Sequence, residues 1–233
     1  MTEQPSTELT SPALRSIVPV TIAAAWLLAA AAIAASGIPA RLRPPVPQLV
    51  LFALTVALLV FGWRSRRFGD WLDRLDWRTI VGFHTSRAIA GAAFLAAAQR
   101  GDLPKQWAEP SAYGDIAVAV LALLVVIAVS PQRPIGRRVY FLWNIIGLAD
   151  ILAVVIGAAR MAMADPSSMV GLFRLPLALI PLWLVPLIIA SHVLLFARLR
   201  HARYRTFRAQ LTRALAAPGV VPQCRRIVCT KCE

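Results

Sequence analysis

The sequence has 233 residues, of which 58% are hydrophobic, and its mean hydropathy is +0.66. Soluble domains carry about 45–50% apolar residues. This excess, gathered into uncharged runs of about twenty residues, indicates a membrane protein. The 25 Lys and Arg against 11 Asp and Glu give a formal net charge of +14. Because these basic residues lie mainly between and after the apolar runs, as they do beside membrane spans, we expect no nucleic-acid binding.

The N-terminal part of the chain predicts a tail and two membrane spans. Residues 1–15 are polar and rich in Thr, Ser and Pro, which predicts a mobile cytoplasmic tail. The alanine-rich run 17–35 lacks the basic start of a secretory signal, so we interpret it as a retained first span. The second span, 46–63, ends at Trp63 and Arg64, whose side chains suit the membrane interface.

The connection 64–78 combines apolar side chains at helical spacing with charged residues. The apolar residues are Phe68, Trp71, Leu72 and Leu75, and the charged ones include Asp70, Asp73, Arg74 and Asp76. Such a pattern is typical of a short amphipathic helix in the headgroup region. We therefore expect this segment to lie flat on the membrane.

The third predicted span, 80–98, is an apolar run that contains His84 and Arg87. On a continuous helix these two side chains, three residues apart, lie on one face. An unpaired arginine near the bilayer centre costs about 2.5–3.5 kcal/mol. Arg87 therefore requires partners, or water, supplied by other helices.

Three further spans are predicted at 112–129, 139–161 and 175–196. The fold class is therefore all-α, a polytopic membrane bundle with six transmembrane helices. This transmembrane domain occupies residues 16–197. The remaining residues, 198–233, form a basic cytoplasmic tail that we expect to contact anionic lipid headgroups.

The distribution of Lys and Arg predicts the orientation. With six spans, 18 of these residues fall on the side of the two termini, whereas the first, third and fifth loops together hold 5. The positive-inside rule then places both termini in the cytoplasm.

Several polar side chains of different spans fall at similar depths, at 1.5 Å of rise per helical residue. They form a predicted intramembrane cluster in the cytoplasmic half of the bundle: His84, Arg87, Asn144, Asp150 and His192. Within it we expect Arg87 to pair with Asp150. Intramembrane charges mark functional sites by default, but a buried ion pair also fixes helix packing. Both interpretations stay open.

Three functions are compatible with this cluster. Ionisable groups in a cavity suit a small transporter-like or accessory membrane protein, with Arg87 attracting an anion. In the first alternative, His84 and His192, at matched depth on two helices, are the axial ligands of a b-type haem. The second alternative is a purely structural subunit that packs against a protein partner of unknown identity.

We predict neither a catalytic site nor a metal site. The chain has no P-loop, no Gly-rich dinucleotide loop and no G-x-S-x-G, so enzyme activity is not expected. The histidines and the distant carboxylate lack metal-ligand spacing. Three cysteines lie in the last ten residues, too few for a closed zinc site unless a fourth group joins, and their role stays open: Cys224, Cys229 and Cys232.

Two features of the later spans are interpreted as architectural. Asp115 and Arg160 fall near the outer ends of consecutive spans, which predicts an ion pair at the rim. Pro181 and Pro186 each remove one helical hydrogen bond. The favoured interpretation is a simple kink, and the alternative is a break that lines a ligand site.

Five spaced motifs run through the predicted spans three to six. They are His84-x-x-Arg87, Gly101-x-Leu-Pro104, Gly114-Asp115, Trp143-Asn144-x-x-Gly147-x-x-Asp150 and Pro176-x4-Pro181-x4-Pro186-x5-His192. Together they resemble a set of small bacterial integral membrane proteins that are recorded as hypothetical or uncharacterised. The resemblance implies a multi-pass protein of the bacterial inner membrane, and it implies no particular activity.

Overall fold

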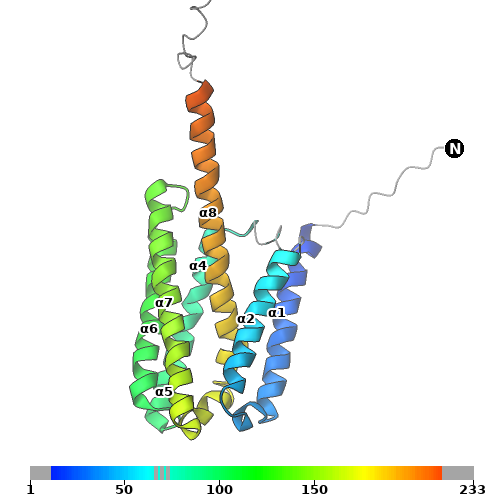
Figure 1. Cartoon of the computed structure of the whole chain (residues 1–233), viewed down its shortest axis with the longest axis vertical. Helices are drawn as coiled ribbons and strands as arrows, with labels where there is room; N and C mark the ends of the chain where they lie inside the picture. Colours follow the sequence, from blue (N-terminus) through cyan, green and yellow to red (C-terminus); the bar gives the residue numbers. More distant parts are fainter. Residues whose placement is uncertain (1–11, 66–67, 69–70, 72–73, 217–233) are drawn as a thin grey trace, which may run out of the picture. The chain divides into compact units, whose positions relative to one another are not determined.

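The computed structural model describes residues 12–65, 68, 71 and 74–216, and within them the chain is all-α (Figure 1). The α-helices are α1 (Pro12–Ala35), α2 (Val46–Arg64), α4 (Trp77–Phe83), α5 (Arg87–Arg100), α6 (Lys105–Ala128), α7 (Pro134–Ala164) and α8 (Val185–Ala216). Three 3-10 segments and one π-helical turn complete them: η1 (Pro39–Arg41), η2 (His84–Ser86), η3 (Pro166–Phe173) and the π-turn η4 (Ile180–Leu184). The chain divides into two compact units, residues 1–195 and 196–233.

Five helical stretches of the described residues are long and apolar enough to cross a bilayer. They are Val46–Arg64, Trp77–Arg100, Lys105–Ala128, Pro134–Ala164 and Ile180–Arg200. A shorter apolar helix, Val20–Ala35, precedes them. Many large apolar side chains of these helices face outward, as bilayer contact requires. The stretches therefore indicate a multi-pass membrane protein.

Helices α5, α6 and α7 form the most closely packed part of the first unit, with α6 against both neighbours. Their core includes Phe94, Trp107 and Ile151, each at most 6% exposed. α1 is tied to η4 by Trp183, whose Nε1 donates to the carbonyl of Ala23 at 3.1 Å. The apolar N-terminal helix is therefore part of the bundle.

The third predicted span is not a continuous α-helix. α4 and α5 are separated by the 3-10 turn η2. The hydroxyls of Thr85 and Ser86 donate to the carbonyls of Gly82 and Phe83, at 2.7 Å each. Side chains that bond to these carbonyls compete with the regular helical ladder. The break therefore begins at His84 and ends directly before Arg87, the two residues that the sequence marks as polar.

The sixth predicted span is also irregular. The π-turn η4 contains Pro181 and ends just before Pro186, so the segment is more than the simple kink that we favoured. Proline at 181 deprives the carbonyl of Leu177 of its helical donor. That carbonyl instead accepts from the amide of Ile180 at 2.9 Å. The distortion thus satisfies the backbone inside the bundle.

The predicted surface helix 64–78 lies only partly within the described residues. Phe68 contacts Phe61 and Trp71, with ring centroids 5.3 and 5.4 Å apart. Several residues of the prediction fall outside the described residues: Asp70, Leu72 and Asp73. Residues 1–11 and 217–233 also lie outside the described residues, and the second range includes the three cysteines.

A first prediction concerns the close approach of α5 to α6. A Cβ on Gly91 would lie 2.7 Å from the carbonyl oxygen of Ala112, whereas one on Gly82 would meet nothing within 4 Å. Gly91→Ala should therefore cost about 1–3 kcal/mol through overpacking. Gly82→Ala is the matched control and should leave stability unchanged or raise it, because alanine favours helix. Heat unfolding of both variants in detergent, followed by circular dichroism, checks this. Equal midpoints would contradict the packing argument.

A second prediction concerns Asp165, which precedes η3. Its Oδ1 accepts from the Oγ of Ser167 at 2.7 Å and from its amide at 2.9 Å. These hydrogen bonds lower the pKa of Asp165. Because the pKa is lower in the folded state, the stabilisation is present above the ordinary aspartate pKa of about 3.9 and is lost as pH falls through the lowered pKa.

The amide shift of Ser167, followed by NMR, should therefore titrate with a midpoint below that ordinary value. In Asp165→Asn the titration should disappear. A midpoint at or above the ordinary aspartate pKa in the unaltered chain would refute the assignment.

Candidate functional site

Polar side chains of five helical segments, η2, α5, α6, α7 and α8, meet inside the bundle, and they include all five members of the predicted cluster. Four are fully buried: His84, Arg87, Asn144 and His192. Asp150 keeps 23% of its side chain exposed. Asp115, which the sequence analysis assigned elsewhere, joins them and is 2% exposed.

Arg87 donates from three of its nitrogens to three different groups. Its Nε donates to Oδ1 of Asp115 on α6 at 2.6 Å, and its Nη1 donates to the carbonyl of Gly147 on α7 at 2.9 Å. Its Nη2 donates to Oδ2 of Asp150, also on α7. The planar guanidinium thus joins α5, α6 and α7 at one point. We name Arg87, Asp115 and Asp150 the arginine centre; with both carboxylates ionised it carries one net negative charge.

The predicted rim ion pair between Asp115 and Arg160 is wrong. Asp115 pairs with Arg87 in the interior, and Arg160 is exposed. The reason is that α6 begins at Lys105 and not at residue 112, so Asp115 lies about 15 Å into the helix. The sequence analysis began this span at residue 112, after the charged residues Lys105 and Glu109, and so placed Asp115 near its start.

Two glycines make room for the polar groups. A Cβ on Gly114 would overlap Oδ1 of Asp150, so the residue before Asp115 admits the second carboxylate. A Cβ on Gly147 would lie 2.7 Å from Cε1 of His192. Gly147 therefore accepts a hydrogen bond from Arg87 through its carbonyl, and its missing side chain leaves room for the imidazole of His192. The motifs Gly114-Asp115 and Gly147-x-x-Asp150 thus have a steric cause, because a side chain at either glycine would collide with a polar group of the cluster.

His84 and His192 form an imidazole pair. Their ring centroids are 4.3 Å apart, with the planes inclined at 47°. Trp143 packs against both rings, at 4.9 Å from His84 and 5.6 Å from His192. The pair comes from η2 and α8, so it joins the break in the third span to the last helix.

The hydrogen bonds occupy one nitrogen of each imidazole. Asn144 donates from Nδ2 to the carbonyl of His192 at 3.1 Å, so its Oδ1 accepts from Nδ1 of His192 at 2.7 Å. The hydroxyl of Ser191 lies within hydrogen-bond distance of Nε2 of His84, at 3.0 Å, and of the carbonyl of Ile188, at 2.8 Å. Nδ1 of His84 and Nε2 of His192 are buried with no partner among the described residues. One nitrogen of each ring is thus unpartnered, and in His192 this nitrogen is an acceptor.

This pair does not fit a b-type haem. Axial ligands stand on opposite faces of the macrocycle, whereas these two rings are in contact, with centroids 4.3 Å apart. No porphyrin can lie between them. Among the described residues, no group of three or more His, Cys, Asp or Glu is placed to hold a metal ion.

Comparison with known proteins gives one family. A model described as a domain of unknown function (DUF8737) matches residues 44–200, a range that includes the arginine centre and the imidazole pair. No curated protein and no solved structure matches the chain.

A third prediction tests how much the arginine centre contributes to the stability of the fold. Arg87→Ala leaves two carboxylates uncompensated in the interior and should cost about 3–5 kcal/mol. Arg100→Ala on the same helix is the control, because its pair with Asp102 is exposed and should be worth no more than about 1 kcal/mol. Unfolding midpoints in detergent measure both effects. Similar losses in the two variants would mean that the centre does not hold the helices together.

Proposed function

We propose a function for this chain, which belongs to the DUF8737 family of unknown function: a small transporter-like membrane protein whose arginine centre takes up and releases a cation. The simplest such cation is a proton. The centre then couples the binding of this cation to the transport of a substrate. The proposal does not name that substrate.

We infer six spans, with α1 as the first, and both termini in the cytoplasm of a bacterial inner membrane. The 24 residues of α1 are long enough to cross a bilayer about 30 Å thick. The unequal distribution of Lys and Arg between the two sides supports the orientation.

The observation that carries the proposal is that one buried guanidinium is bonded to two carboxylates. A net charge inside the membrane is costly, and one bound cation removes it. Asp150 is the more accessible carboxylate, with 23% of its side chain exposed against 3% for Asp115. Uptake at Asp150 requires the least rearrangement of the buried bonds.

The hydrogen bonds of Arg87 also change which ligand we expect this residue to attract. A lone guanidinium would attract an anion, but the donors of Arg87 already bond to two carboxylates and a carbonyl. A further anion would add to an existing negative charge. A cation is therefore favoured over the anion that the sequence analysis considered.

The irregular helical turn next to Arg87 supports a moving part. The breaks η2 and η4 interrupt two spans, and the first of them carries His84. Discontinuous spans line the binding sites of many transporters, because their ends can shift against the rest of the bundle. A mid-span 3-10 or π segment often marks such a hinge.

The competing function is purely structural, because the arginine centre also ties three helices together. The two functions differ in their response to Asp150→Asn. The asparagine oxygen can still accept from Arg87, and Asp115 keeps the guanidinium paired, so the variant should fold. It should no longer bind a cation, because the net charge is gone.

The fourth prediction uses charge displacement in solid-supported proteoliposomes. A pH jump should give a transient current with the unaltered protein, and Asp150→Asn should reduce it at least tenfold. Asp102→Asn, in an exposed pair outside the centre, should leave it unchanged. A sodium jump at constant pH distinguishes sodium from protons. No current in the unaltered protein, or an undiminished current in Asp150→Asn, would favour the structural function.

A further inference from the structure

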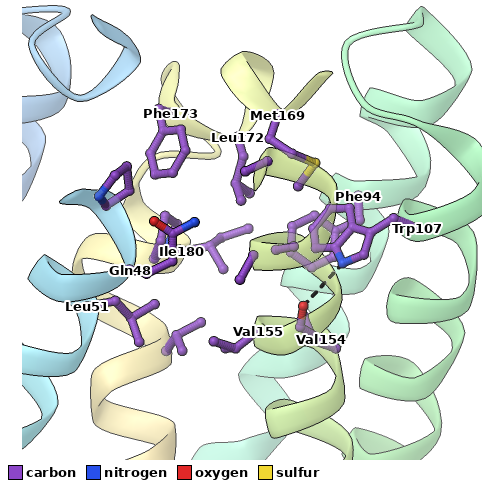
Figure 2. A pocket seen from close by; sticks show the side chains of 16 residues that line it. Gln48, Leu51, Phe94, Trp107, Val154, Val155, Met169, Leu172, Phe173 and Ile180 are labelled. Carbon is purple, nitrogen blue, oxygen red and sulfur yellow. Dashed lines mark hydrogen bonds between the residues drawn. The ribbon is translucent and has the colours of Figure 1, made fainter. Parts of the chain in front are cut away.

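Two parts of the bundle have no role in the proposed cation site: an apolar cavity and the imidazole pair. The cavity, of about 70 Å³, is lined by residues of α2, α5, α6, α7, η3 and η4, among them Gln48, and by no charged side chain (Figure 2). Its Trp107 already donates from Nε1 to the carbonyl of Val154 at 3.1 Å, the dashed line in Figure 2. The side chains that line this cavity cannot bind or release a proton, whereas an imidazole can.

His192 lies next to the arginine centre. Its Nδ1 donates to Oδ1 of Asn144, so its Nε2 carries a lone pair, and this nitrogen is buried with no partner among the described residues. A Cβ on Gly147 would lie 3.1 Å from Nε2. The carbonyl of the same glycine accepts from Nη1 of Arg87 at 2.9 Å. The backbone of Gly147 thus packs against both the basic nitrogen and the guanidinium.

Three residues of α7 position His192 relative to a carboxylate. Asn144, Gly147 and Asp150 follow one another at intervals of three residues, so they share one side of the helix. Asn144 fixes the imidazole, Gly147 leaves room for it, and Asp150 is the more accessible carboxylate of the arginine centre. This spacing sets a proton acceptor about one helical turn from a carboxylate.

His84 connects the imidazole of His192 to a less buried hydroxyl. The two ring centroids are 4.3 Å apart, and Nε2 of His84 lies 3.0 Å from the hydroxyl of Ser191. That hydroxyl also lies 2.8 Å from the carbonyl of Ile188. Its single hydrogen can serve only one of these acceptors at a time, so a turn of the hydroxyl changes which nitrogen of His84 carries a proton. His84 is fully buried, whereas Ser191 is partly exposed.

The charges next to the pair favour a proton there. Apart from the two imidazoles, the charged side chains at this place are Arg87 on α5, Asp115 on α6 and Asp150 on α7. The guanidinium opposes a second positive charge, but the two carboxylates outweigh it. A proton on either imidazole is therefore drawn toward the arginine centre.

A coupling site also needs more than one route to solvent. The site of a transporter exchanges its ion with each side of the membrane in turn. The exposed edge of Asp150 offers one route. Asn144, which bonds His192, precedes Asp150 by six residues, about 9 Å along α7. The imidazole pair therefore lies toward the end of the bundle where α7 begins, the end that we infer to be cytoplasmic.

We propose that Ser191, His84 and His192 form the route by which protons pass between the cytoplasmic side and the arginine centre, an inference that rests on the proposed function. The hydroxyl of Ser191 gives a proton to Nε2 of His84, and Nδ1 of His84 gives one to Nε2 of His192. Nε2 of His192 then gives its proton to the carboxylate of Asp150. Each step breaks one O–H or N–H bond and forms one, and water returns a proton to Ser191. Release follows the same steps in reverse.

The fifth prediction concerns the rate of the transient current after a pH jump, with the full chain in proteoliposomes sorted by orientation through a tag on the C-terminus. Where the C-terminus faces the jump, Ser191→Ala should slow the current about tenfold or more, because it removes the first proton carrier. Ser191→Thr keeps a hydroxyl and should leave the rate unchanged. In the opposite orientation the jump reaches Asp150 from the other side, so Ser191→Ala should be as fast as the unaltered chain.

A second variant separates proton transfer from packing. His84→Gly should be slow in the same orientation as Ser191→Ala, and free imidazole should restore its rate. Pyrazole, which has the same shape but is a much weaker base, should not. Equal restoration by the two compounds would overturn the route, as would slowing of either variant in both orientations.

The outcomes distinguish the route from the cation site. A current that Asp150→Asn abolishes, and that stays fast in both Ser191→Ala and His84→Gly, would overturn the route alone. No current from the unaltered chain in either orientation would overturn the proposed function and the route with it.

Discussion

The bonds of the Arg87 guanidinium are the constraint on which the rest of this bundle depends. A charge so far from water needs counter-charges within hydrogen-bond distance, and α6 and α7 each supply one carboxylate. This requirement sets how closely α5, α6 and α7 approach, which in turn demands small residues at their contacts. Gly91, Gly114 and Gly147 meet that demand, each at a position where a Cβ would collide with a neighbour.

One irregular turn of the bundle, η2, lies among its polar groups, and the other, η4, lines its apolar cavity. The 3-10 turn η2 begins at His84 and ends directly before Arg87, and the π-turn η4 precedes the helix that carries His192. Broken helices are costly in lipid unless the freed carbonyls find donors, and here side-chain hydroxyls and neighbouring amides serve. The bundle thus keeps its breaks inside the protein.

The arginine centre and the cavity beside Gln48 differ in chemistry although α7 contributes to both. One is ionic, with the guanidinium of Arg87 bonded to two carboxylates; the other is lined by apolar side chains and carries no charge. The two imidazoles provide a third environment, in which contact between the rings excludes haem and each ring keeps one free nitrogen. The ligand that each part of the bundle can accept follows from these contrasts.

The sequence by itself determined the membrane class, the all-α fold and the polar residues of the interior, because apolar runs and the charges within them are local properties. It misplaced Asp115, because the depth of a residue depends on where its helix begins, and the charged residues Lys105 and Glu109 hid the true start of α6. Only the tertiary structure decided that Arg87 has two carboxylate partners, that the imidazoles touch, and that Gln48 faces a cavity. These depend on contacts between helices distant in sequence, and no single helix encodes them.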